Sequence, residues 1–127
     1  MRHFSTVLSL LTEFSLYFLD DQGIELIRLG TERTSQFNSI SEDVVLTALN
    51  VILDTRNYPM CLMCDVGRHR SGVVVGCLRK LQRWNLTAIF EEYRRYAGSK
   101  VRLINEQFIE LFDTDQVQIP TLPPKWL

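Results

Sequence analysis

A chain of 127 residues, 46% of them hydrophobic, is long enough to bury one core, and we expect residues 1–127 to form a single domain. Its formal net charge of −1 argues against a nucleic-acid partner, and its apolar runs are too short to span a membrane. An odd number of cysteines and the lack of a secretory leader pattern indicate reduced thiols in a cytoplasmic protein.

Strands and helices are expected to alternate in the first half of the chain. Short apolar runs predict strands at 4–11, 24–29 and 60–63. Between them we expect a short helix at 16–21, a polar loop at 30–39 and a helix at about 42–53 that Ser41 caps. Strands joined by helical crossovers predict an α/β fold with a short, mostly parallel sheet.

The second half is expected to be helical. Helices are predicted at about 71–84, 86–97 and 100–112, the second capped by Asn85 and ended by Gly98, and the third capped by Ser99. In the third helix the residues expected to face the core are Val101, Ile104, Phe108, Ile109 and Phe112. Residues 113–127 hold three prolines and should be ordered but irregular, with Trp126 packed back onto the body.

The stretch that carries chemistry runs from Cys64 to Ser71, Cys-Asp-Val-Gly-Arg-His-Arg-Ser, between a predicted strand and a predicted helix. A loop that feeds a helix N-terminus directs backbone N–H groups at one point, which suits a phosphate. The same environment lowers the pKa of a thiol, and the planar guanidinium of Arg70 can hold two phosphate oxygens. Gly67 allows close backbone approach. We therefore predict Cys64, Arg70 and Ser71 as the catalytic residues.

In this mechanism the Cys64 thiolate attacks phosphorus in line, and water then hydrolyses the cysteinyl-phosphate. Arg70 and the loop N–H groups stabilise the charge, so neither a metal nor another cofactor is required. Three carboxylates remain open as the general acid, and each is also explained as a solvated loop residue. They are Glu13, Glu32 and Asp65.

The expected phosphate-binding residues fall into two groups. The first is the loop itself, with Asp65, Val66, Gly67, Arg68, His69 and Arg70, although His69 is equally explained as a brace for the loop. The second is a basic run of Arg94, Arg95, Lys100 and Arg102, which could wall the same pocket. Helical cations more often face solvent and pair with nearby acids such as Glu91 and Glu92.

Cys61 and Cys64 also form a C-x-x-C pair, which suggests redox chemistry. A thioredoxin-like pair would lie at a helix start, whereas Cys61 falls inside a predicted strand. No second pair or histidine cluster in the sequence supports a zinc site.

Three stretches, residues 64–72, 74–86 and 90–97, resemble the plant and fungal atypical dual-specificity phosphatases, and most closely the fungal oxidant-induced cell-cycle-arrest branch. The resemblance covers residues 40–127 well and the first 40 more loosely. It implies a cysteine-phosphatase fold and activity on phosphorylated inositols, notably the diphosphate group of inositol pyrophosphates, with phosphoinositides or phosphotyrosine as secondary substrates. It also implies Cys64 as nucleophile, Arg70 as phosphate clamp and residues 94–102 as a basic wall, and it allows a hetero-oligomer of family members.

The chain departs from this family in three places. Met63 replaces the histidine before the cysteine, and Thr34-Ser35-Gln36-Phe37 replaces Lys-Glu-Pro-Phe. The family also carries a segment and a strand before residues 4–11, so we expect either a fragment or a shortened variant, in which the strand at 4–11 is an exposed edge.

Two hypotheses follow from the site. An active phosphatase is favoured by Cys64, Arg70 and Ser71, and a pseudophosphatase that binds phosphate or serves as a complex subunit is favoured by Met63. A rhodanese-like transferase fits the helical second half poorly. A low-molecular-weight tyrosine phosphatase is disfavoured because its loop follows the first strand.

Overall fold

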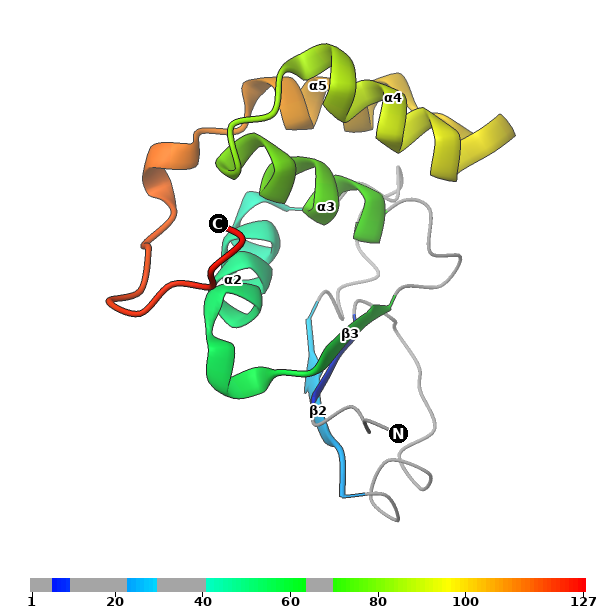
Figure 1. The fold of residues 1–127 in the computed structure, drawn as a ribbon. Helices are drawn as coiled ribbons and strands as arrows, with labels where there is room; N and C mark the ends of the chain where they lie inside the picture. The colour runs from blue at the N-terminus through cyan, green and yellow to red at the C-terminus, as the bar shows by residue number, and fades with distance from the viewer. Residues whose placement is uncertain (1–5, 10–22, 30–40, 64–69) are drawn as a thin grey trace.

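In the computed structural model the chain forms a three-stranded parallel sheet beside a stack of helices (Figure 1). The structure describes residues 6–9, 23–29, 41–63 and 70–127. The strand β1 (Thr6–Ser9) lies between β2 (Glu25–Arg28) and β3 (Met60–Met63), and both pairings are parallel. The predicted parallel sheet is confirmed. The expectation that the first strand forms an exposed edge is wrong, because β1 is paired on both sides.

The helix α2 (Glu42–Leu53) begins where the sequence predicts. The Oγ atom of Ser41 accepts a hydrogen bond from the Val44 N–H at 3.3 Å, and Glu42 and Asp43 occupy the first turn. Helical spacing buries one face, made of Val45, Ala48, Leu49, Ile52 and Leu53. A short 3-10 helix, η1 (Thr55–Asn57), then leads into β3.

Two helices of equal length, α3 (Arg70–Leu81) and α4 (Leu86–Ala97), form an antiparallel hairpin. As predicted, Asn85 caps α4, with its Oδ1 atom 2.8 Å from the Ala88 nitrogen, and Gly98 ends it with φ +59°. The helix α3 ends three residues earlier than expected. Arg83 adopts φ +67°, and the N–H groups of Arg83 and Trp84 bond back to carbonyls of the last turn, each at 3.0 Å.

The last helix, α5 (Leu103–Leu111), differs most from its prediction. Residues Gly98–Lys100 form the 3-10 helix η2, and Arg102 takes the N-cap position, so the predicted cap at Ser99 is wrong. The buried face also differs from the prediction. Ile104 is 49% exposed and Val101 also lies at the surface, whereas Asn105 and Glu106 are buried. Ile109 and Phe112 face the core as predicted.

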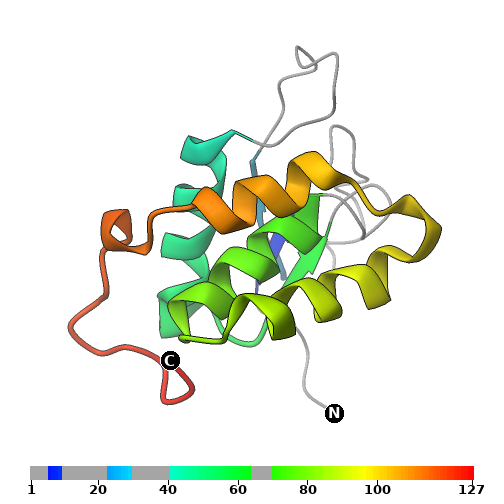
Figure 2. The same cartoon turned by 90° about the horizontal axis from the view of Figure 1, so that it is seen from above.

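The core centres on α3, which runs between α4 and α5 when viewed from above (Figure 2). Its buried Val73, Val74 and Cys77 pack in one cluster with Leu8 of β1 and with the buried face of α2. The ammonium group of Lys80 fixes the end of α5 by donating to three of its last carbonyls, among them that of Phe112 at 2.7 Å.

Residues 113–127 contain one short 3-10 helix, η3 (Thr114–Gln116), and are otherwise irregular, as predicted. The tail is tied to α3 through the Gln82 side-chain amide, which donates to the Trp126 carbonyl at 3.1 Å. Trp126 as a residue is 44% exposed, so the expected packing is partial. No helix in the described part of the chain is long and apolar enough to cross a membrane.

Candidate active site

The candidate site lies at the carboxyl end of β3, the position where parallel α/β sheets bind ligands. β3 ends at Met63 and α3 begins at Arg70, so six residues connect them. The predicted order of strand, short connection and helix is therefore confirmed. Six predicted site residues fall in this connection, outside the described residues. They are Cys64, Asp65, Val66, Gly67, Arg68 and His69, and their roles stay predictions.

Arg70 and Ser71 form the first turn of α3. Arg70 is half-buried and Ser71 is 9% exposed. The first-turn N–H groups of a helix lack carbonyl partners within the helix, and its dipole places positive potential there. This end of α3 can therefore bind an anion. Glu13 and Glu32, two candidates for the general acid, lie outside the described residues.

The hairpin of α3 and α4 brings the second basic group to the same end of the molecule. The helices are antiparallel, and the ring of Tyr93 in α4 packs on Gly72 in the first turn of α3, so the end of α4 approaches the start of α3. The last turn of α4 carries Arg94 and Arg95, and η2 with Lys100 follows. The proximity of the two basic groups and their contact with phosphate both stay predictions.

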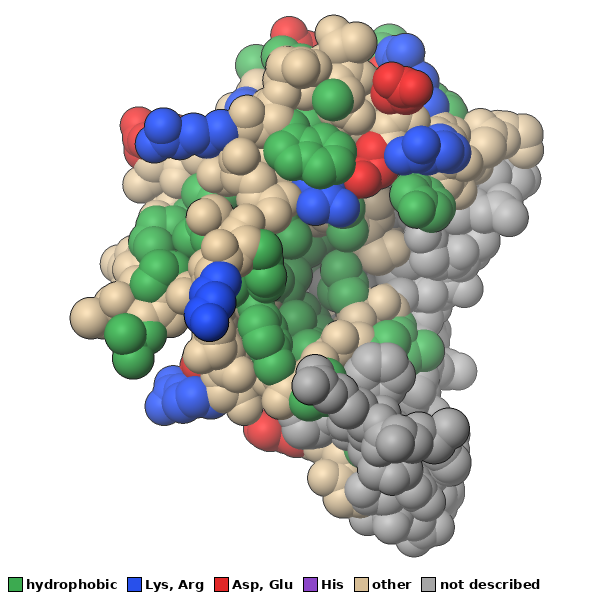
Figure 3. All heavy atoms as spheres, in the orientation of Figure 1, with side chains coloured by type: hydrophobic (Ala, Val, Ile, Leu, Met, Phe, Trp, Pro, Cys, Tyr) green, Lys and Arg blue, Asp and Glu red, His purple; other side chains and the backbone are tan. Residues whose placement is uncertain are grey.

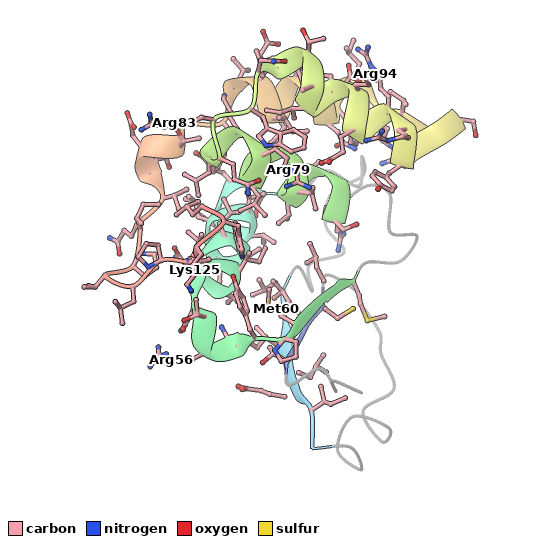
Figure 4. The ribbon with its side chains drawn as sticks, in the orientation of Figure 1. Arg56, Met60, Arg79, Arg83, Arg94 and Lys125 are labelled. Atoms are coloured by element: carbon pink, nitrogen blue, oxygen red, sulfur yellow. The ribbon has the colours of Figure 1, made fainter. Side chains whose placement is uncertain are left out.

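The cations of this group differ in their surroundings. Arg94 forms an ion pair with Glu106 of α5, with 2.6 Å between Nε and Oε1, and this bond raises the pKa of Arg94. Figure 4 shows Arg94 at the outer side of the helical layer. Arg95 is exposed, its guanidinium carbon 5.6 Å from the centre of the Tyr96 ring, and Arg102 is half-buried. Arg94 is therefore committed to a carboxylate.

The polar role of Tyr93 was not predicted from the sequence. The residue is 4% exposed, and its hydroxyl accepts hydrogen bonds from the Asn105 side-chain amide at 3.0 Å and from the Arg102 backbone N–H at 3.3 Å. Its ring packs against Gly72, where an added Cβ would lie 3.2 Å from two ring carbons. A buried tyrosine hydroxyl normally forms a hydrogen bond, and this rule was the signal from which the polar role of Tyr93 could have been predicted.

A cavity of about 340 Å³ opens beside the first half of α3. Leu62, Val75 and Ile89 contribute apolar side chains, and hydrophobic groups gather below the helical layer in Figure 3. Its principal charges, Arg79 and Glu92, neutralise each other across 3.0 Å, and Arg79 also stacks 4.3 Å from the Trp84 ring centre. The cavity therefore suits apolar groups better than phosphates.

The two described cysteines are free thiols with different surroundings. Burial raises the pKa of Cys77 to about 12, which excludes it as a nucleophile near neutral pH. Cys61 is half-buried within β3, as expected of a strand residue. Among the described residues there is no cluster of His, Cys, Asp or Glu that could hold a metal ion.

The parallel sheet, the six-residue connection and the helix that begins with Arg-Ser define a fold of the cysteine-phosphatase class. A family profile described as the tyrosine phosphatase family matches residues 3–127. The chain belongs to the tyrosine phosphatase family.

Individual relatives agree with this assignment. The chain is 63% identical over 111 residues to the Dictyostelium discoideum protein named "Probable tyrosine-protein phosphatase DG1060". This alignment covers 87% of this chain and 66% of that protein. The chain is 42% identical over 107 residues to inositol diphosphatase DSP4 of Arabidopsis thaliana, covering 84% of this chain and 54% of the relative. The chain thus spans less than two thirds of the length of these relatives.

Solved structures support the fold. The core catalytic domain of the PP-IP phosphatase SIW14 from Saccharomyces cerevisiae, solved with citrate, superposes with a TM-score of 0.80 at 38% identity. The match covers 89% of this chain and 70% of that domain. The predicted family resemblance and the predicted cysteine-phosphatase fold are therefore both confirmed.

Proposed function

We propose that this protein is a metal-independent cysteine phosphatase that removes phosphate from the diphosphate group of inositol pyrophosphates. The observation that carries the proposal is the position of Arg70 and Ser71 in the first turn of α3, six residues after β3. The names of two relatives support the substrate class, since one is an inositol diphosphatase and the other a PP-IP phosphatase. Phosphoinositides and phosphotyrosine are secondary substrates in this proposal.

The reaction we propose has two steps. The Cys64 thiolate attacks the terminal phosphorus in line, the phosphorus–oxygen bond to the leaving phosphate breaks, and a general acid protonates that oxygen. Water then attacks the cysteinyl-phosphate, releasing inorganic phosphate and the thiolate, and in this proposal the Ser71 hydroxyl stabilises the departing sulfur by a hydrogen bond. Arg70 and the loop N–H groups stabilise both transition states. Glu13, Glu32 and Asp65 remain the candidates for the acid.

Further parts of the proposal concern the whole protein. We propose a single domain over residues 1–127, a cytoplasmic location and association with other members of the family. The basic wall of Arg95, Lys100 and Arg102 would contact phosphates that do not react, because a polyphosphorylated ring presents several of them beside the site.

A pseudophosphatase is the second candidate, and one observation favours it. Met63 is the last residue of β3, directly before Cys64, and a thioether cannot donate the hydrogen bonds that a histidine would supply to the loop. Under this hypothesis the protein would bind polyphosphates with little turnover.

Phosphate release from an inositol pyrophosphate and from a phosphotyrosine peptide tests the proposal, measured for wild type, Cys64→Ser and Cys61→Ser. The Cys61 variant is the matched control, because it removes a half-buried thiol three residues away. We expect turnover of the pyrophosphate that Cys64→Ser abolishes and Cys61→Ser preserves. Binding of the pyrophosphate with no turnover by wild type would support the pseudophosphatase instead.

A further inference from the structure

The side chain of Tyr93 contacts two parts of the candidate site at once. Its ring packs on Gly72, two residues after Arg70, so close that a Cβ at Gly72 would lie 3.2 Å from ring carbons Cδ2 and Cε2. Its hydroxyl, carried by the ring carbon next to Cε2, accepts from the Arg102 N–H at 3.3 Å and from the Asn105 amide at 3.0 Å. One rigid ring therefore connects the first turn of α3 with the start of α5.

The segment that this hydroxyl holds carries two of the predicted cations. Residues 98–102 connect α4 with α5 and include Lys100 and Arg102. Gly98 begins the segment with φ +59°, and Arg102 ends it at an N-cap position that has no side-chain capping bond among the described residues. A connection of this kind depends on tertiary contacts for a fixed position.

Burial strengthens the contact. Tyr93 and Asn105 are each 4% exposed, so water cannot replace either bond without opening the helical packing. The Arg94–Glu106 pair, on the neighbouring residue of each helix, joins α4 and α5 at the more exposed surface. The buried and the exposed contact together fix the last turn of α4 against the first turn of α5.

We infer that Tyr93 is a positioning residue that sets the distance between the phosphate site at α3 and the cations of residues 98–102. The inference rests on the proposed function, because it assumes that these cations bind phosphates of the same substrate. A substrate with several phosphates depends on this distance, whereas a substrate with one phosphate does not. Tyr93 is thereby a determinant of selectivity for polyphosphorylated substrates.

Steady-state kinetics of Tyr93→Phe test the inference, with an inositol pyrophosphate and p-nitrophenyl phosphate as substrates. The variant keeps the ring on Gly72 and removes only the hydroxyl. Tyr96→Phe is the matched control, because Tyr96 is on the same helix, one turn later, and is 70% exposed. We expect the KM for the pyrophosphate to rise about tenfold, equivalent to about 1.4 kcal/mol, with its kcat and both constants for p-nitrophenyl phosphate within about twofold. Tyr96→Phe should change none of them.

Equal losses on both substrates would overturn the inference, since Tyr93 would then support only the fold. Unchanged constants for the pyrophosphate would also overturn it. Asn105→Ala is a second variant that leaves the tyrosine intact and removes one of its two partners, and we expect a smaller rise in the same KM.

A binding measurement separates this inference from the proposed function. If wild type hydrolyses neither substrate, the proposed function fails, and calorimetry with inositol hexakisphosphate decides the positioning role. Weaker binding to Tyr93→Phe, with faster hydrogen exchange in residues 98–102 than in wild type, would support it. Equal binding by wild type and Tyr93→Phe would contradict it.

Discussion

Arg94 and Glu106 form a two-point ion pair between α4 and α5, with 2.6 Å from Nε to Oε1 and 3.0 Å from Nη2 to Oε2. The Glu106 side chain is 8% exposed and that of Arg94 is 59% exposed. The carboxylate is therefore the buried partner, and the more exposed guanidinium shields it from solvent. A lysine could not reproduce both bonds, because its ammonium group is a single point of charge.

The first prediction concerns this pair as a structural brace. Arg94→Lys and Glu106→Gln should each lower the melting temperature, and the double variant should lose no more than the worse single variant, because one interaction is removed in all three. Thermal unfolding of the four proteins measures this. If the two losses of stability add, the two side chains do not act as one brace. If Arg94→Lys only raises the KM for a polyphosphate, Arg94 is a ligand rather than a brace.

The second prediction concerns the contact between Gly76 of α3 and Ile109 of α5. A Cβ built on Gly76 would lie 2.9 Å from Cγ1 of Ile109, a fully buried side chain, so an alanine forces one helix to move. We expect Gly76→Ala to lower the free energy of unfolding by about 1–3 kcal/mol. Urea denaturation gives this value directly.

Ile109→Val provides the matched test for Gly76. The valine lacks the Cδ1 atom nearest to the added methyl group, so the double variant should lose less stability than the sum of the two single variants. Simple additivity would show that the contact with Ile109 is not what excludes a side chain at Gly76.

These contacts show where sequence reasoning reaches its limit. Local signals predicted α2 and α4 closely, because Ser41, Asn85 and Gly98 act within one turn of the ends they mark. The predicted start of α5 was wrong because Ser99 looks like a helix cap in sequence, whereas residues 98–100 form a 3-10 helix. The burial of Asn105 and Glu106 was missed because both look like surface residues in sequence. Both are buried by partners on α4, twelve residues earlier, and no periodicity within α5 carries that information.

The site shows the same division between local and tertiary information. The order of strand, connection and helix around Cys64 follows from local pattern, and so does the place of Arg70 at the start of α3. The approach of the end of α4 to the start of α3 depends on the packing of the Tyr93 ring on Gly72, which joins two antiparallel helices. The role of Tyr93 depends on three elements meeting, which only the folded chain shows.

The third prediction concerns the end of α3. Arg83 is the non-glycine residue with a left-handed φ in the described part of the chain, and such a conformation costs about 1–2 kcal/mol for a residue with a Cβ. Glycine adopts it without that strain. Arg83→Gly should therefore raise the free energy of unfolding by about 1 kcal/mol, as measured by urea denaturation.

Arg83→Ala is the control for this substitution. It removes the same charge and keeps a Cβ, so we expect stability close to that of wild type. Stabilisation by alanine equal to that by glycine would assign the effect to the charge and contradict the backbone explanation.

The fourth prediction is a pH dependence that arises from Cys77. Burial raises its pKa to about 12, whereas in the unfolded chain the thiol ionises near pH 8.5. Above that pH the unfolded chain loses a proton that the folded protein keeps. The contribution of the Cys77 thiol to the free energy of unfolding is therefore fully present below about pH 8.5 and is lost as the pH rises toward 12. Cys77→Ala should remove this part of the alkaline loss.

The measurement is the free energy of unfolding at several pH values between about 8 and 11, where one such group contributes at most about 1.4 kcal/mol per pH unit. Cys61→Ala, which removes the half-buried thiol of β3, is the control for the loss of a thiol as such. An unchanged slope in Cys77→Ala would show that other groups, such as the tyrosines, cause the alkaline loss.

The central claim is that Cys64 forms a covalent bond to phosphorus at the start of α3. Its most direct test is mass spectrometry of the protein after acid quench during turnover of an inositol pyrophosphate. The account predicts one phosphoryl group on the peptide that contains Cys64, present in wild type and absent from Cys64→Ser. Turnover with the phosphoryl group on another residue, or hydrolysis that persists in Cys64→Ser, would contradict it.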